Sequence, residues 1–310
     1  MAAVRPASPS GVLVVDKPSG MTSHDVVARV RRALRTREVG HAGTLDPMAT
    51  GVLVVAIGEA TKLVPYLTAD DKAYVAEITF GRATDTLDAE GTTTREGEVP
   101  TDLEARLVEA LALEEARTEQ VPPAFSAIHV AGERAHVLAR RGEVVDLPAR
   151  AVAARALRLE ALTGHTARVR VEVAKGYYVR ALARDLGDRV GCPAHLSSLR
   201  RTRSGAFRVE DAARLDGDLG AALVPLTDAA ARALPVFTLT PNGVADARAG
   251  RPIASVNLAG APPAEHAAFV ADGVLVAIGQ VEGDGRGRVI RGFRPPSSYI
   301  AVQKSSIERP

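Results

Sequence analysis

The sequence predicts an α+β protein with a large N-terminal domain and a small β-rich C-terminal domain. Two observations predict the mixture: short runs that are apolar or alternate with polar residues, and apolar residues repeated at helical spacing. The strand-like runs lie at residues 11–16, 51–57, 74–80 and 166–174. From about residue 235, short apolar runs alternate with Gly, Pro and Asp turns. We therefore expect one domain over residues 10–235 and another over residues 236–296.

The composition excludes several classes of protein. The 310 residues are 46% hydrophobic, which is ample for a core. Aromatic residues make up only 4% and Trp is absent, so the chain does not bind single strands through rows of stacked rings. The single cysteine, Cys192, excludes an internal disulfide framework and a cysteine zinc site. Without a run of about 18 apolar residues or the apolar core of a signal peptide, we expect a soluble cytoplasmic protein.

Charge is distributed unevenly, although the net charge is only +2. Residues 70–120 contain 14 acidic and 5 basic residues, whereas residues 121–209 contain 16 basic and 7 acidic residues. The second segment is therefore a candidate surface for a polyanion. In the alternative, the two segments fold together and their charges interleave. Charge alone favours the basic surface.

The first elements follow from turn and capping residues. Residues 1–9 are rich in Ala, Pro and Ser and are expected to be disordered. The strand at 11–16 should end at the turn formed by residues 17–20. Thr22 or Ser23 can cap the next helix. Its apolar stripe consists of Val26, Val27, Val30 and Leu34.

The most informative stretch runs from Val39 to Val55. It places three glycines, a proline, a histidine and one carboxylate ahead of an apolar strand. Pro47 biases Asp46 toward an extended conformation, and a carboxylate on a stiff loop before a core strand is well placed for catalysis. The alternative is an ordinary turn in which Asp46 is solvated or caps the backbone. The chemistry of the stretch leaves both interpretations open.

The middle of the chain alternates helices and strands. A helix is expected at residues 59–67 and a strand with one buried face at 74–80. Thr101 and Glu104 have the spacing of a capping box, which predicts a helix to about Leu113.

A polar loop over residues 81–100 contains Asp85 and Asp88. Two aspartates at this spacing could suggest a metal site. Because no third oxygen ligand lies at EF-hand spacing, Asx turns are the favoured interpretation.

Residues 121–148 are expected to form a basic insert. Arg134, Arg140 and Arg141 lie near glycines, so we expect a mobile arm suited to phosphates. Strands at 150–159 and 166–174 and a helix ending at Val190 should complete the domain, and residues 297–310 are expected to be a tail.

The segment 40–51 reads Gly-His-Ala-Gly-Thr-Leu-Asp-Pro-Met-Ala-Thr-Gly. It resembles the catalytic loop of the TruB family of pseudouridine synthases, whose motif has the form GHxGTLDPxATG. Further segments resemble the same family in the same chain order: 11–23, 71–74, 120–142, 175–180 and 196–205. The resemblance covers about residues 10–235.

This resemblance implies the pseudouridine synthase catalytic fold, in which helices flank a central mixed, mostly antiparallel sheet. It also implies a small PUA-like RNA-binding domain at the C-terminus. Asp46 is implied as the nucleophile, with Arg180 opposite it. Tyr178 is implied to lie against the target base as a candidate acceptor of the C5 proton.

The resemblance also implies substrate contacts for other residues of the chain. The resemblance places Tyr74 and Leu199 on the walls around the uracil ring. His41 is implied to occupy the space left by the flipped base.

Three basic residues are also implied to bind substrate: Lys17, Arg134 and Arg141. The insert departs from the family at two positions. The family usually has a Tyr where this chain has His136, and usually a Lys near His129. Both departures remain polar, so the implied RNA contact is retained.

The implied activity is isomerisation of uridine to pseudouridine at position 55 in the T loop of tRNA, by base flipping. Nothing is oxidised and no group arrives from elsewhere, so we expect no cofactor and no metal. The T stem-loop of tRNA is the implied partner, and we expect a monomer. Guide-RNA-dependent relatives share the catalytic motif, but the short insert and the chain length favour an enzyme without a guide RNA.

Two other functions are weighed against this one. A non-catalytic tRNA-binding or tRNA-folding protein would share the basic segment but would not need Asp46. A carboxylate glycosidase would need a second positioned acid, for which Asp85 and Asp88 are the only nearby candidates.

Overall fold

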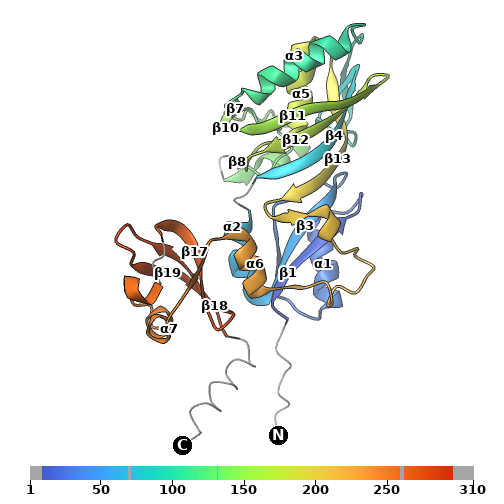
Figure 1. Ribbon diagram of the computed structural model, residues 1–310. Coiled ribbons are helices and arrows are strands. Elements are labelled where there is room, and N and C mark those ends of the chain that lie inside the picture. Colours follow the sequence, from blue (N-terminus) through green and yellow to red (C-terminus); the bar gives the residue numbers. More distant parts are fainter. Residues whose placement is uncertain (1–8, 69–70, 131, 259–261, 296–310) are drawn as a thin grey trace, which may run out of the picture.

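The computed structural model describes residues 9–68, 71–130, 132–258 and 262–295. A mixed nine-stranded sheet runs through the larger part of the molecule (Figure 1). Every strand pair in it is antiparallel except β13–β3, which confirms the predicted α+β class. In spatial order the sheet contains β11 (Ala154–Thr163), β12 (Thr166–Val173), β4 (Lys72–Phe80), β13 (Ala194–Ser204), β3 (Thr50–Ile57), β1 (Gly11–Lys17) and β15 (Val224–Pro225), with β14 (Phe207–Arg208) beside β13 and β2 (Val39–Ala42) beside β3.

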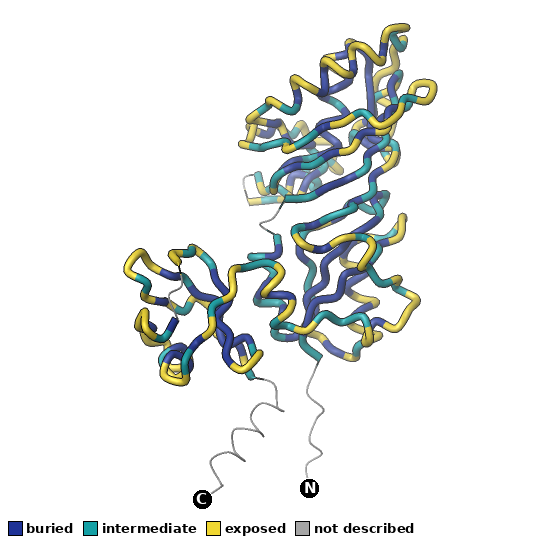
Figure 2. Tube along the Cα trace, viewed as in Figure 1, coloured by how far each residue is buried: buried dark blue, intermediate teal, exposed yellow. Residues whose placement is uncertain are grey.

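Helices cover both faces of this sheet. Three of them, α1 (Ser23–Ala33), α3 (Leu103–Glu115) and α5 (Val179–Val190), contribute to the same core as the inward residues of the strands. On the opposite face, α6 (Leu226–Ala233) and the short helices η1 (Gly58–Leu63) and α2 (Val64–Leu67) cover β1 and β3. A further 3₁₀ turn, η2 (Val209–Asp211), follows β14. The central strands are the most deeply buried part of the chain (Figure 2).

Most element boundaries agree with the predicted ones. Strand β4 alternates as expected, with Tyr74, Ala76, Ile78 and Phe80 buried. Thr22 caps α1, and its hydroxyl and the carboxylate of Asp25 form a capping box. The predicted helix at 59–67 is a 3₁₀ turn that continues into one turn of α-helix.

Two local predictions were wrong. Helix α3 begins at Leu103, and its N-cap residue is Asp102, whose side chain makes no capping bond, so Thr101 and Glu104 do not form a capping box. The strand predicted at 150–159 is interrupted: β10 (Arg150–Ala151) pairs with β7 (Glu119–Gln120), and β11 starts afterwards. The break separates the pair at the base of the insert from the main sheet.

The separate acidic and basic segments pack against each other, which corrects the expected basic surface. Arginines of the second segment pair with carboxylates of the first. Examples are Arg155 with Asp71, Arg158 with Glu115 and Arg189 with Glu114. The charges therefore interleave, because β12 lies between β11 and β4 and α5 packs on α3.

The C-terminal region forms a second, four-stranded sheet with the order β16–β17–β18–β19. Its elements are β16 (Val236–Thr238), α7 (Pro241–Arg248), η3 (Ser255–Leu258), β17 (Ala264–Ala271), β18 (Val274–Val281) and β19 (Gly287–Gly292). The sheet packs on α6 and η1 through an apolar cluster, and Lys62 Nζ donates to the carbonyl of Gly292 at 3.2 Å. This confirms a small β-rich unit at the end of the chain.

Two small hairpins complete the description. β5 (Arg82–Thr84) pairs with β6 (Thr93–Glu96), and β8 (His129–Val130) pairs with β9 (Glu133–Arg134), which leads into α4 (Ala135–Arg140). Among the described residues, no helix is both long and apolar enough to cross a membrane. Residues 1–8 of the expected disordered start and the expected tail at 297–310 lie outside the described residues.

Candidate active site

Asp46 lies on the loop between β2 and β3, and side chains from distant elements bind the backbone of this loop. Arg201 on β13 donates to the carbonyls of Gly43 at 3.1 Å and Thr44 at 3.3 Å. The Ser23 hydroxyl donates to the carbonyl of Leu45 at 3.1 Å and lies 2.9 Å from the Leu45 amide. The backbone on the N-terminal side of Asp46 is therefore held by two elements that are far away in sequence.

Lys17 binds the backbone on the other side of Asp46. Its ammonium donates to the carbonyls of Pro18 at 3.0 Å, Met21 at 2.6 Å and Pro47 at 3.1 Å, and the residue is fully buried. Burial lowers the pKa of Lys17 to about 8, while the nearby Asp46 carboxylate acts in the opposite direction. With its three protons directed at carbonyls, Lys17 has none left for a phosphate. The structure corrects its expected role from substrate contact to support of the loop.

Gly51 explains how the loop can approach Arg201 so closely. Its φ is +95°, and a Cβ at this position would lie 2.1 Å from the carbonyl oxygen of Arg201. Only glycine fits here, because both the left-handed backbone and the parallel contact of β3 with β13 exclude a side chain.

Asp46 and Arg180 form the expected pair. Arg180 Nε lies 2.8 Å from Asp46 Oδ2, and Nη2 donates to Oδ1 at 3.3 Å. The side chain of Arg180 is 8% exposed and that of Asp46 is 35% exposed. A buried, bidentate guanidinium thus orients a carboxylate that remains partly open to solvent.

Arg180 also binds two other loops. Nη1 donates to the carbonyl of Thr86 at 3.0 Å and Nη2 to that of Phe125 at 2.9 Å. A second carboxylate, Asp88, is buried 3.7 Å from Nη1. Sequence reasoning weighed Asp88 as a turn residue, a metal ligand or a glycosidase acid, and its proximity to Arg180 was missed because no local spacing signals it.

Of the Asx turns expected around Asp85 and Asp88, the one at Asp88 is present, whereas Asp85 bonds the amides one and seven residues further on. Asp85 Oδ1 accepts from the amides of Thr86 at 2.8 Å and Thr92 at 2.7 Å. Asp88 Oδ1 accepts from the Glu90 amide at 3.1 Å. In the described part of the chain, no three His, Cys, Asp or Glu side chains gather as metal ligands.

The expected wall residues lie in the core beside the loop. Tyr74 and Leu199 are 7% and 6% exposed and belong to the same apolar cluster as Leu45. The Leu199 carbonyl also lies 3.5 Å from the Thr50 hydroxyl, directly after the loop.

Tyr178 is the N-cap residue of α5, two positions before Arg180. Its backbone amide and carbonyl are bonded to the side chain of Gln120. Burial raises the pKa of its phenol, so at neutral pH the group is a neutral hydroxyl and a weaker base than a free tyrosinate.

His41 on β2 contacts a second histidine that sequence reasoning did not connect with it. The rings of His24 and His41 are 5.3 Å apart in an edge-to-face arrangement. His41 Nδ1 is buried, and no group among the described residues bonds it. Burial, aided by the charge of His24, lowers the pKa of His41 and favours its neutral form.

The basic residues of the insert make no hydrogen bond or ion pair with Asp46 or Arg180 among the described residues. Arg134 is exposed. Arg141 donates to both carboxylate oxygens of Glu133, at 3.0 and 2.6 Å. The structure therefore does not bring Arg134 and Arg141 to Asp46, and their contact with RNA stays a prediction.

The fold and the oriented carboxylate define the class of protein as an enzyme of the pseudouridine synthase fold. The chain superposes on a structure described as a Cbf5–Nop10–Gar1 complex with a TM-score of 0.71 and 27% identity, over 92% of this chain and 84% of that one. A second similar structure, an H/ACA RNP bound to a substrate RNA containing 2′-deoxyuridine, gives a TM-score of 0.70 and 26% identity, over 93% and 86% of the two chains.

Sequence comparisons are more specific. The model of the TruB family pseudouridylate synthase N-terminal domain matches residues 31–179, and that of the tRNA pseudouridylate synthase B C-terminal domain matches residues 180–234. A tRNA pseudouridine synthase B from Mycobacterium sp. (strain KMS) is 44% identical over 86% of this chain and 91% of its own length. The relative from Thermobifida fusca is 48% identical over 74% and 82%. The chain belongs to the TruB family.

Proposed function

We propose that the chain isomerises uridine to pseudouridine at position 55 in the T loop of tRNA, without a guide RNA. The observation that carries this proposal is the Asp46 carboxylate, open to solvent and held by the buried Arg180 guanidinium. The names of the relatives, which are tRNA pseudouridine synthases B, support the substrate.

The reaction breaks the N1–C1′ bond, turns the uracil ring, joins C5 to C1′ and releases one proton from C5. Asp46 is the nucleophile, and Arg180 aims it and stabilises its negative charge. Asp88, on the other side of Arg180, adds a second negative charge that fixes the guanidinium between two carboxylates. Arg180 is thereby oriented from both sides before substrate arrives.

The target nucleotide must leave the RNA stack to reach Asp46. Turning it out costs a few kcal/mol, which stacking and phosphate contacts offset. Tyr74 and Leu199 provide the apolar wall for the ring, Tyr178 lies against it and takes the C5 proton, and neutral His41 fills the vacated space. Because burial raises the pKa of Tyr178, its phenol is protonated at neutral pH, so it can take the C5 proton only as it passes its own proton to solvent.

RNA contact extends beyond the active site. Arg134 and Arg141 of the insert over residues 121–148 would contact phosphates. The four-stranded sheet within residues 236–296 would serve as a PUA-like RNA-binding domain beside the catalytic domain over 10–235. We further propose that the protein acts as a monomer in the cytoplasm.

The test is incubation of the purified protein with a tRNA transcript that carries no modification, followed by mapping of pseudouridine. We expect one pseudouridine at position 55, with the RNA mass unchanged and no other RNA added. A transcript with cytidine at position 55 should remain unmodified. Release of free uracil would instead indicate a glycosidase, and an absence of product with retained tRNA binding would indicate a binding protein.

A further inference from the structure

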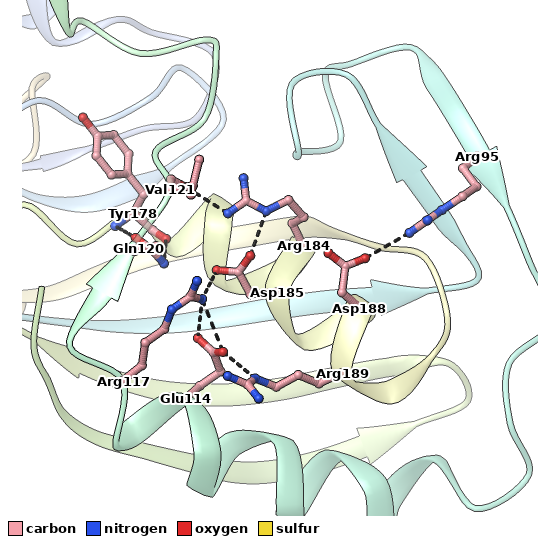
Figure 3. Close-up of polar contacts among 10 residues, drawn as sticks. All are labelled: Arg95, Glu114, Arg117, Gln120, Val121, Tyr178, Arg184, Asp185, Asp188 and Arg189. Carbon is pink, nitrogen blue, oxygen red and sulfur yellow. Dashed lines mark hydrogen bonds and ion pairs between the residues drawn. The ribbon is translucent and has the colours of Figure 1, made fainter. Parts of the chain in front are cut away.

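Helix α5 begins at the active site without a capping side chain of its own. Tyr178 occupies the N-cap position, and its side chain makes no capping bond. The backbone of Tyr178 is instead held by the amide of Gln120. Gln120 Oε1 accepts from the Tyr178 amide at 2.9 Å, and Gln120 Nε2 donates to the Tyr178 carbonyl at 3.2 Å (Figure 3).

Gln120 is the last residue before the insert. It is 1% exposed and belongs to β7, which pairs with β10 across the base of the insert, so that Gln120 lies opposite Arg150. One buried side chain thus joins the base of the insert to the residue that starts the catalytic helix. A buried amide with both of its polar atoms bonded has a single orientation.

A group of buried charges fixes the segment that carries Gln120. Glu114 on α3 is fully buried and receives Arg189 Nε at 2.6 Å and Arg117 Nη1 at 3.2 Å. Arg117 also pairs with Asp185 of α5, which in turn pairs with Arg184 (Figure 3). These pairs connect α3, α5 and the residues just before β7.

Two further bonds connect α5 with the start of the insert. Arg184 Nη2 donates to the carbonyl of Val121 at 2.9 Å. Arg180, which holds Asp46, donates to the carbonyl of Phe125. Residues 120–125 and the first two turns of α5 are therefore bonded at three points, and the Gln120 amide makes the one that reaches Tyr178.

We propose that Gln120 is a positioning residue for the isomerisation. Through the backbone of Tyr178 it sets where the phenol lies against the target base, and it connects the insert to the active site. The inference depends on the role given to Tyr178 in the proposed function. Its physical basis is that the backbone dihedrals of an N-cap residue determine the direction of its side chain, and a displacement of about 1 Å at a reacting centre can cost about 10²-fold in rate.

The first test compares Gln120→Met with the wild-type protein. Met has nearly the same length and no polar amide, so the two bonds to Tyr178 are lost with little change in volume. We expect the single-turnover rate on unmodified tRNA to fall about 10- to 100-fold, while the Kd for tRNA changes less than about threefold, because no substrate contact is removed. Leu107→Ala on α3 is the control: it destabilises the same core without touching Tyr178, and its single-turnover rate below the melting range should equal that of the wild type.

A double-variant cycle separates positioning from general damage. In a Tyr178→Ala background there is no phenol to position, so adding Gln120→Met should lower the rate no further. If the two losses multiply, or if Gln120→Met keeps the wild-type rate, the proposal is wrong.

Gln120→Glu provides a second test, which also applies if Gln120→Met does not fold. A protonated carboxyl group offers one donor and one acceptor as the amide does, whereas the carboxylate has no donor for the Tyr178 carbonyl. The ratio of the variant rate to the wild-type rate should therefore be highest at pH 5 and fall about tenfold as the carboxyl group loses its proton, at a pH that burial raises. A ratio that is constant from pH 5 to pH 8 would contradict the proposal. Loss of all activity in the wild-type protein would instead contradict the proposed function.

Discussion

The Asp46 loop and the insert over residues 121–148 are held in contrasting ways. The carbonyls of residues 43–48 all accept hydrogen bonds, four of them from side chains of β1, α1 and β13 that lie far away in the chain. The insert contains a two-residue hairpin pair and a six-residue helix, and one of its ion pairs, Arg141 with Glu133, is local and exposed. One of the seven loop residues 43–49 is exposed, against twelve of the 27 described residues of the insert.

This contrast shows that the Asp46 loop has a fixed geometry, whereas the insert can change its conformation. Buried bonds in a region of low dielectric are strong, and leaving one partner unsatisfied is costly, so the loop has one arrangement. Exposed ion pairs contribute at most about 1 kcal/mol, so the insert can adapt to a phosphate backbone. The predictions below test this difference, starting from the largest effect.

Asp46→Asn should have the largest effect. The amide keeps the shape of the side chain but removes the charged nucleophile, so pseudouridine formation should fall by more than about 10³-fold. Binding of tRNA should stay within about tenfold, or about 1.4 kcal/mol, of the wild type. The check is a quench-flow assay combined with filter binding. Full activity in this variant would remove Asp46 from the mechanism.

Arg201→Met should destabilise the rigid Asp46 loop. The guanidinium is 1% exposed and serves the carbonyls of Gly43, Thr44 and Val52, so its loss leaves buried acceptors without a donor. We expect the free energy of unfolding to fall by about 2–3 kcal/mol.

The matched control for Arg201 is Arg134→Met in the insert, which should change stability by less than about 0.5 kcal/mol. Both values come from urea unfolding followed by circular dichroism. Equal losses in the two variants would show that loop and insert are held alike.

Lys17 predicts a dependence of the rate on pH. Its ammonium is required to serve three carbonyls beside Asp46, so the single-turnover rate should be high below pH 8 and fall about tenfold above it, as the group with a pKa of about 8 loses its proton. Lys17→Met should lower the rate at neutral pH and remove this step from the profile.

Stability should respond in the opposite direction. The unfolded chain binds the Lys17 proton more tightly than the folded chain, with a pKa of 10.5 against about 8. Between these values the contribution of this group to the free energy of unfolding rises with pH. A rate that falls together with stability would mean that unfolding, and not the loop, causes the loss.

The smallest expected effect concerns the insert. Arg134→Ala should weaken tRNA binding a few-fold and reduce the slope of log K against log salt by about one. Arg141→Ala should change the slope less, since its guanidinium is already paired with Glu133. Slopes measured by filter binding that match the wild type in both variants would exclude phosphate contact by this arm.

Periodicity predicted the strands and helices well, because β4, β12 and α1 each bury one regular face. It did not place the residues that support the site. The supporting residues are Lys17 and Arg201, which bind carbonyls of the Asp46 loop, and Asp88, which pairs with Arg180. Each is far from its partner in the sequence, so no local spacing of residues indicates the contact.

Charge counts were misleading for a related physical reason. They record sequence segments, whereas pairing follows the sheet: β12 lies beside β4, and α5 packs on α3, so opposite charges from the two segments meet. The Asp46–Arg180 pair was predicted only through the family motif, since 134 positions separate the two residues.

The support of the loop by Arg201 has a consequence for biosynthesis. The two residues joined by its longest-range bond are 158 positions apart, so a growing chain carries an unsupported Asp46 loop until β13 has left the ribosome. Closing so long a loop is slow, because its entropy cost must be met before the stabilising contacts form. No N-terminal fragment that ends before β13 should therefore modify RNA, and in refolding experiments product formation should begin only when β13 has docked.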